Sequence, residues 1–343
     1  MKVLLGMSGG VDSTYAVHEL KRMGCEVFGA VVKMHSYTET EEARLSAEAL
    51  GIPLYVIDGT GLFEKKVVSS FINEYRAGRT PNPCIICNRE VKFKLLLDFA
   101  LENGFDKIAT GHYADIVEIS DGNGVRHALK RSEDEKKDQT YMLWRLPEEV
   151  LSHLVFPLSG ITKETVKREA EKMELRAAYR GESQEICFIP NGDYAGFIEQ
   201  RAGKCPEGNF VDETGKILGR HKGIIHYTVG QRKGLGIALG ERAFITDINP
   251  ERNDITLSTR DSYSESFFIS DIIFSGLAEA KCGDTVELFV KHRYLAPLSK
   301  ARVTFLEGGR AKVELLTPIR AVTPGQSAVF YENGVLMMGG IIE

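Results

Sequence analysis

The sequence predicts an α/β fold, a parallel sheet with helices on both faces, followed by a small β-rich module and a C-terminal β-barrel. Three observations support this prediction. Strand-like and helix-like segments alternate over residues 1–113, the helical periodicity fades from about Asn209, and short strands separated by turns then continue to the C-terminus. Strands that alternate with helices build parallel sheets covered on both faces. We expect a catalytic domain over 1–200, a central β-rich domain over 201–262 and a barrel over 263–343.

The elements of the first domain follow from apolar runs and helical spacing. Strands are expected at 3–5, 27–32, 54–57 and 107–110, and helices at 41–50, 63–75, 91–102 and 162–175. Thr162 is a good N-cap residue for the last helix. A hairpin is expected around 120–124, and the charged stretch 130–139 after it has the composition of a solvated loop.

The C-terminal half is expected to consist of short strands. Turn residues stand at 212–215, 308–309 and 333–334. Strands are expected between and beside them, at 286–290, 301–306, 311–315 and 328–331.

Length and composition restrict the class of protein. The 343 residues favour two or three domains, and the net charge of −5 argues against a generally basic nucleic-acid coat while allowing a local basic face. There is no apolar stretch long enough to span a bilayer. Met1 runs directly into the first strand, so we expect no signal peptide and a cytoplasmic protein.

Six cysteines are few for a chain of this length, and in a reducing compartment they are poor candidates for a disulfide framework. They are Cys25, Cys84, Cys87, Cys187, Cys205 and Cys282. A cysteine with a special role is therefore expected to be chemical or metal-binding.

The first loop, Ser8-Gly9-Gly10-Val11-Asp12-Ser13, connects the first strand to a helix. Its two glycines allow the turn to present main-chain N–H groups to an anion, and the serines add hydroxyl donors. The positive end of the following helix points at the same place. These features predict a phosphate-binding loop, although an ordinary βα turn is the alternative for the glycines alone. The loop lacks the Gly-Lys-Ser/Thr of a Walker motif.

Two further stretches contain cysteines. In 80–94, two prolines stiffen the approach, and Asn88 is expected to cap a helix that begins near Glu90. Cys87 would then lie just before a helix N-terminus, where the helix dipole and nearby lysines favour the thiolate. In 181–189, Cys187 stands in a turn-like segment between helices. Taken alone, each cysteine is better explained as a buried structural thiol.

The loop 8–13 resembles the pyrophosphate loop of ATP pyrophosphatases, which cleave ATP between the α and β phosphates. Together with 80–94, 181–189, Gly230-Gln231-Arg232-Lys233-Gly234-Leu235-Gly236 and Thr323-Pro324-Gly325-Gln326, it makes the chain similar to the bacterial tRNA-specific 2-thiouridylase family. The resemblance implies an adenine nucleotide α-hydrolase-like fold and thiolation of the wobble uridine in Lys, Glu and Gln tRNAs. It implies an ATP site formed by Gly6, Met7, Ser8, Gly9, Gly10, Val11, Asp12, Ser13, Val32 and Gly111.

The resemblance also implies a reaction order. The flipped uridine's 2-oxygen is adenylated with release of pyrophosphate, and Asp12 either holds Mg²⁺ or orients the loop. Cys187 carries a persulfide supplied by a cysteine desulfurase or sulfur-relay protein. Cys87 is the nucleophile that resolves the persulfide, which leaves a Cys87–Cys187 disulfide for reduction.

The resemblance also implies tRNA contacts at positions spread along the chain. The oligomeric state that we expect is a monomer. The contact residues are Asn82, Pro83, Cys84, His112, Lys137, Asp138, Gln139, Arg293, Tyr294 and Gln326. Arg293 and Tyr294 also suit RNA on their own account, as a cation beside a stacking ring.

One departure from the family pattern opens an alternative. Many relatives carry Asp, a proposed acid/base residue, where this chain has Cys84. Cys84, Cys87 and Cys187 supply three thiolates, which could hold a 4Fe–4S cluster with one iron open to sulfide; zinc on these residues would lack an evident fourth ligand. The remaining alternatives are a non-catalytic ATP-binding module and another ATP pyrophosphatase, although no glutaminase signature is present.

Overall fold

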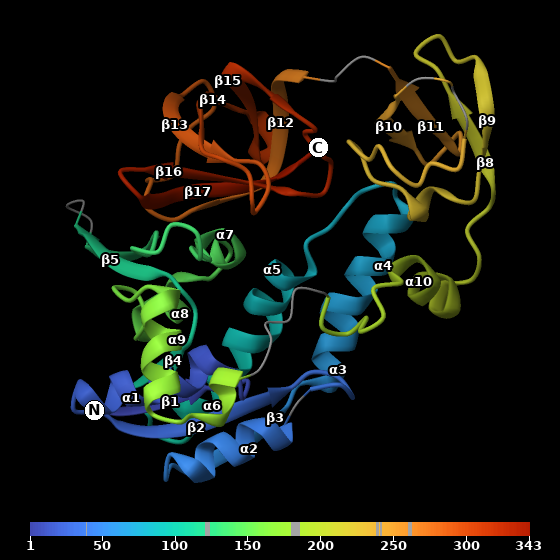
Figure 1. The fold of residues 1–343 in the computed structure, drawn as a ribbon. Helices are drawn as coiled ribbons and strands as arrows, with labels where there is room; N and C mark the ends of the chain where they lie inside the picture. Colours follow the sequence, from blue (N-terminus) through green and yellow to red (C-terminus); the bar gives the residue numbers. More distant parts are fainter. Residues whose placement is uncertain (39, 121–123, 180–185, 238–239, 241, 260–262) are drawn as a thin grey trace.

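The computed structural model describes all residues except 39, 121–123, 180–185, 238–239, 241 and 260–262. The first domain is built on a five-stranded parallel sheet of order β3-β2-β1-β4-β7, which lies at the bottom of Figure 1. Its strands are β1 Lys2–Gly6, β2 Glu26–Lys33, β3 Leu54–Asp58, β4 Lys107–Thr110 and β7 Leu154–Val155. The predicted parallel sheet is confirmed.

Helices cover both faces of this sheet because successive strand residues point to opposite sides. Val3 and Leu5 pack against α1, α2 and α9, whereas Leu4 packs against α6 and α8. The helices are α1 Val11–Arg22, α2 Thr40–Ala49, α3 Thr60–Phe63, α4 Ser69–Arg76, α5 Pro83–Cys87, α6 Phe93–Glu102, α7 Thr140–Leu143, α8 Glu148–His153, α9 Lys163–Lys172 and α10 Tyr194–Ala202. Thr162 caps α9 as predicted, accepting a bond from the Thr165 N–H.

Two long helices are interrupted by π-helical turns. The turn Glu64–Val68 joins α3 to α4, and the turn Asn88–Lys92 joins α5 to α6. Each pair therefore forms one continuous helical rod. Single 3-10 turns occur at Arg176–Tyr179, Ile224–His226 and Glu307–Gly309.

The β-rich module is a four-stranded sheet of order β10-β11-β8-β9, at the upper right of Figure 1. Its strands are β8 Gly208–Val211, β9 Ile217–His221, β10 Phe244–Asn249 and β11 Asp254–Ser258. The predicted turn at 212–215 is confirmed, because the Asp212 carboxylate accepts the N–H groups of Thr214 and Lys216.

The C-terminal strands form a closed barrel, at the upper left of Figure 1, because β12 pairs with both β15 and β17. The barrel strands are β12 Tyr263–Phe274, β13 Thr285–Lys291, β14 Ser299–Leu306, β15 Arg310–Arg320, β16 Ser327–Glu332 and β17 Val335–Ile342. The predicted hairpin exists as β5 Asp115–Ser120 and β6 Val125–Lys130, although residues 121–123 of its turn lie outside the described residues. It extends the barrel sheet, since β6 pairs with β17.

The barrel is packed firmly on the first domain. Trp144 is fully buried, and its indole N–H donates to the Ser327 hydroxyl over 3.0 Å. Gly339 lies against the Trp144 ring, and a Cβ at this glycine would stand 2.2 Å from a ring carbon. This contact fixes the barrel relative to the segment that follows α7 of the first domain. Among the described residues, no helix has the length and apolar character needed to cross a bilayer.

Candidate active site

The first loop has the shape of an anion cradle. Gly9 adopts a φ of +74°, and a Cβ there would lie 2.7 Å from the Glu42 backbone, so only glycine fits. Ser8 and Ser13 are tied together, with 3.2 Å between their hydroxyl oxygens, and the Ser13 hydroxyl donates to the Gly10 carbonyl. Gly10 is the N-cap of α1, so the positive end of this helix faces the loop.

The loop carboxylate is held by residues that the sequence analysis missed. Both oxygens of Asp12 lie 2.7 Å from the Lys163 ammonium, and the Tyr113 hydroxyl donates to Asp12 over 2.8 Å. Lys163 is the first residue of α9, which the sequence predicted, but no local pattern indicates that this helix begins beside the loop. The ion pair favours the role of Asp12 in orienting the loop.

A cavity of about 710 Å³ adjoins the loop and has the volume of a small-molecule site. Gly6, Met7, Ser8, Asp12, Ser13, Val32 and Gly111 of the predicted ATP residues line it. Gly9, Gly10 and Val11 belong to the same loop but are not among its lining residues. Gly111 permits a close approach of strand and helix, because a Cβ there would lie 2.8 Å from the Ser13 nitrogen.

The two predicted catalytic cysteines have different surroundings, and only Cys187 lines the cavity. Cys187 is exposed and lines the cavity, whereas Cys87 is buried and contacts the Met34 thioether, with 3.2 Å between the sulfur atoms. Burial raises the pKa of Cys87 to about 12, with Lys92 opposing the shift and Cys187 and Cys84 adding to it. Cys87 therefore lies within electrostatic range of both other thiols. Residues 181–185 of the predicted cysteine segment lie outside the described residues.

Two predictions about Cys87 are wrong. Asn88 does not begin a helix, because Asn82 caps α5 by accepting the Cys84 N–H and Pro83 occupies the first helical position. Cys87 therefore lies inside a continuous helical rod, away from its positive end. The predicted thiolate is also wrong for this state, because burial favours the thiol.

We expect alkylation of Cys87 by iodoacetamide to accelerate about tenfold per pH unit from pH 7 to 10, because only the thiolate reacts and its pKa is raised to about 12. Free N-acetylcysteine should level off above about pH 9. Peptide mass mapping gives the rate for Cys87 separately from that for Cys84. A Cys87 rate already constant at pH 7 would contradict the structure and restore the prediction of a thiolate.

The three cysteines do not fit an iron–sulfur cluster. Among the residues that the structure describes, no group of three His, Cys, Asp or Glu side chains is arranged to hold a metal ion. The Cys87 sulfur faces the Met34 thioether, and the protein around Cys84 and Cys187 raises both pKa values although solvent reaches them. The alternative of a cluster on Cys84, Cys87 and Cys187 is therefore not supported by the described residues.

Two of the residues expected to contact tRNA line the cavity, and the others lie elsewhere. His112 and Gln139 line the cavity, and the His112 pKa lies well below its usual range because of burial and, secondarily, Lys92. Asn82 and Cys84 lie at the start of α5, where Cys84 is exposed and Pro83 is buried. Lys92 also lines the cavity. The sequence had indicated a role for it only as a cation near Cys87.

Several of these residues hold the domains together. The Gln326 side chain donates to the Thr80 carbonyl over 2.7 Å, and Arg293 bonds the Thr323 hydroxyl and the Val229 carbonyl. Tyr294 packs at 6.1 Å from the Tyr141 ring. These side chains are therefore held in place by bonds between domains, and they would keep that position in any contact with RNA.

The loop 130–139 is less solvated than its composition predicts. Asp138 is buried, and its carboxylate accepts from Thr140 and pairs with Arg131. Gln139 accepts the Tyr113 N–H over 2.9 Å, which fixes the loop beside the cavity. Lys137 is half-buried next to them. The Asp138 carboxylate thus positions the loop, and it is too buried to be an exposed contact residue.

An anion-binding turn at the edge of a parallel sheet, next to a cavity containing a cysteine, defines a nucleotide-dependent enzyme of the HUP class. Family models match almost the whole chain: the tRNA methyl transferase HUP domain over 1–191, the tRNA methyl transferase PRC-barrel domain over 195–259 and the aminomethyltransferase beta-barrel domain over 264–342. The chain belongs to the tRNA-specific 2-thiouridylase family and is a sulfurtransferase-type enzyme with an ATP-using domain.

Two relatives support this family assignment. The chain is 44% identical over 359 residues to the tRNA-specific 2-thiouridylase MnmA of Acetivibrio thermocellus, covering 100% of this chain and 99% of that protein. It is 43% identical over 361 residues to the enzyme of the same name from Clostridium acetobutylicum, with the same coverage. Among solved structures, it is similar to a 4-thiouridine synthetase complexed with RNA and ATP, at 18% identity and a TM-score of 0.36, covering 58% of this chain and 50% of that chain. The family resemblance read from the sequence is confirmed.

Proposed function

We propose that this chain thiolates carbon 2 of the wobble uridine in Lys, Glu and Gln tRNAs. The observation that carries the proposal is the presence of the loop serines and Cys187 in the walls of one cavity. ATP bound at the loop would place its α-phosphate within reach of a base held beside the thiols. Mg²⁺ would arrive with the ATP phosphates, since Asp12 is already paired with Lys163.

The activation step uses the chemistry of the loop. The uridine is extruded from the anticodon loop, because its reacting atoms are otherwise out of reach. Its 2-oxygen attacks the α-phosphorus of ATP, pyrophosphate leaves, and the oxygen becomes part of a good leaving group. The N–H groups of the loop and the α1 N-terminus stabilise the pyrophosphate charge.

The sulfur step uses the two thiols in turn. The terminal sulfur of a Cys187 persulfide attacks carbon 2, and AMP leaves. The Cys87 sulfur then attacks the Cys187 sulfur, so the thiolated base departs and a Cys87–Cys187 disulfide forms, which an external thiol must reduce. Because Cys87 is protonated in the free protein, its proton must be lost before this attack, and Lys92 is the cation that favours the loss.

Pyrophosphate exchange into ATP tests the proposal. We expect exchange only when unmodified tRNA is present, and 2-thiouridine in the nucleosides of tRNA recovered after adding a persulfide donor. Exchange without tRNA would assign the chain to another ATP pyrophosphatase reaction. A complete lack of exchange, with ATP still bound, would indicate a non-catalytic nucleotide-binding module.

A further inference from the structure

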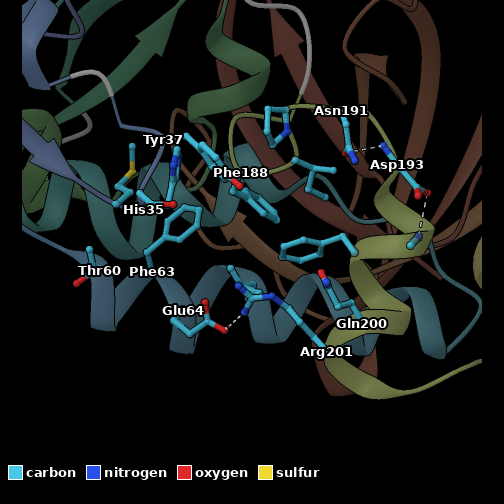
Figure 2. A pocket seen from close by; sticks show the side chains of 17 residues that line it. His35, Tyr37, Thr60, Phe63, Glu64, Phe188, Asn191, Asp193, Gln200 and Arg201 are labelled. Carbon is cyan, nitrogen blue, oxygen red and sulfur yellow. Dashed lines mark hydrogen bonds and ion pairs between the residues drawn. The ribbon is translucent and has the colours of Figure 1, made fainter.

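A second cavity, of about 720 Å³, lies next to the nucleotide cavity and shares part of its wall. Met34, His35, Tyr37 and Pro190 line both. Figure 2 shows the second cavity between the helical rod that contains Thr60 and Glu64 and helix α10, which carries Gln200 and Arg201. None of the residues expected to contact tRNA lines it.

The floor of this cavity is a row of aromatic rings. Ring centroids are separated by 5.5 Å for His35 and Phe63, 5.4 Å for Phe63 and Phe188, and 5.5 Å for Phe188 and Phe197. Gln200 is exposed at the mouth (Figure 2). An apolar floor with polar groups at the edge suits an inserted apolar side chain.

The charges around the cavity argue against RNA. Arg201 is paired with the Glu64 carboxylate, and its guanidinium lies 4.6 Å above the centre of the Phe197 ring. Asp193 adds a carboxylate beside α10, where it accepts the Gly196 N–H. Phosphates need cations that are available to them, whereas the arginine that the described residues contribute to this lining is paired with Glu64. A polypeptide is therefore the better occupant.

The wall of the second cavity contains a buried polar atom that lacks a hydrogen-bond partner among the described residues. The Nδ1 atom of His35 is buried and has no hydrogen-bond partner among the residues that the structure describes. An unsatisfied buried polar atom is costly, so a ligand that meets it gains affinity. Because this atom is closed to solvent, the wall must shift before the main chain of an entering peptide, which offers both a donor and an acceptor, can reach it. Either tautomer of His35 can therefore be satisfied.

The second cavity adjoins the residues that follow Cys187, and this position indicates what it could bind. Cys187 faces the nucleotide cavity, and the residues directly after it, Phe188 to Asn191, face the second one. Sulfur loaded while ATP and an extruded base occupy the first cavity would have to reach Cys187 from another direction. We propose that the second cavity docks the persulfide-bearing loop of a sulfur-donor protein, which packs an apolar side chain against the row of rings formed by Phe63, Phe188 and Phe197. This inference rests on the proposed function.

The transfer at this site is a balanced exchange. The Cys187 thiolate attacks the terminal sulfur of the donor's cysteine persulfide, and the donor's sulfur–sulfur bond breaks. A new sulfur–sulfur bond forms on Cys187, while the donor cysteine leaves as a thiolate with the electron pair. No net oxidation occurs, and no further reactant is needed.

Closing the mouth of the cavity tests the proposal. In Gln200→Trp, an exposed residue becomes a ring that fills the mouth without removing core packing, and Glu171→Trp, an exposed position on α9, is the matched control. Cys187 persulfide formation is followed by mass spectrometry with two donors: a cysteine desulfurase loaded from cysteine, and glutathione persulfide. We expect Gln200→Trp to slow loading from the protein donor at least about tenfold, since blocking an anchor pocket costs about 1.4 kcal/mol or more. Loading from glutathione persulfide should change less than about twofold.

The other outcomes overturn the inference in distinguishable ways. Equal loading of Gln200→Trp and Glu171→Trp by the protein donor would show that the cavity does not dock it. An equal loss with both donors would show a distorted Cys187 segment instead of a docking site. Weaker binding of an anticodon stem-loop by Gln200→Trp would assign the cavity to RNA. Failure of the unsubstituted protein to load Cys187 from either donor would refute the proposed function itself.

Discussion

Cys187→Ser is expected to abolish thiolation, with a loss of at least about 10³-fold in the single-turnover rate of 2-thiouridine formation. The substitution removes the sulfur atom that must carry the transferred sulfane and changes little else. Cys187 is exposed on the cavity wall, so the free energy of unfolding and tRNA affinity should remain nearly unchanged. Quantifying 2-thiouridine in digested tRNA by mass spectrometry measures the effect.

Adenylation provides the matched readout for this variant. Because the loop residues that would bind ATP are untouched, tRNA-dependent pyrophosphate exchange by Cys187→Ser should stay within about twofold of the parent. Cys282→Ser, at another exposed cysteine outside the cavity, is the control and should retain thiolation. Near-normal thiolation by Cys187→Ser would assign the sulfur carrier to another residue. Loss of exchange as well would mean that Cys187 supports the nucleotide site.

The parts of the site that the sequence predicted are those encoded by neighbouring residues. The loop 8–13 was recognisable because its glycines, serines and following helix stand together in the chain. The strands on both sides of it were recognisable from apolar runs. The Thr162 cap was predicted because a capping side chain acts only three residues ahead.

The incorrect predictions concern competition between local signals and the effects of burial. Asn82 and Asn88 are both acceptable caps, but Pro83 directly after Asn82 makes the earlier position the better start. The pKa of Cys87 depends on how much protein surrounds it, which no spacing of residues shows. The sequence also did not show that hairpin β5–β6 extends the barrel sheet across a domain boundary. The strand that β6 pairs with lies far along the chain, so no local pattern reveals the pairing.

The second cavity is a further feature that the sequence alone did not reveal. Its walls come from the segment after β2, the rod built on α3 and α4, and the segment from Phe188 to α10. No local pattern in these segments indicates that they meet. Only their packing creates an aromatic recess lined by the residues that follow the cysteine proposed to carry sulfur. A separate entry for sulfur would allow the nucleotide cavity to remain closed around its substrates.

Lys163→Met is expected to lower kcat/KM for tRNA-dependent pyrophosphate exchange by about 100-fold or more, because it leaves the half-buried Asp12 carboxylate beside the phosphate loop without its cation. An uncompensated negative charge at this position also repels the ATP phosphates. Lys167→Met, at an exposed position one turn further along α9, is the matched control and should be close to neutral. Exchange kinetics at saturating tRNA give both values.

A double-mutant cycle with Asp12→Asn separates two possible roles of the lysine. If Lys163 acts only by orienting Asp12, the double variant should be no worse than the poorer single variant. If the ammonium also leaves Asp12 to meet the phosphates during the reaction, the two losses should approach additivity. The 2.7 Å contacts to both carboxylate oxygens favour the first result. Unchanged exchange in Lys163→Met would show that the loop keeps its shape without the ion pair, and the orientation of Asp12 would then depend on the Tyr113 hydroxyl.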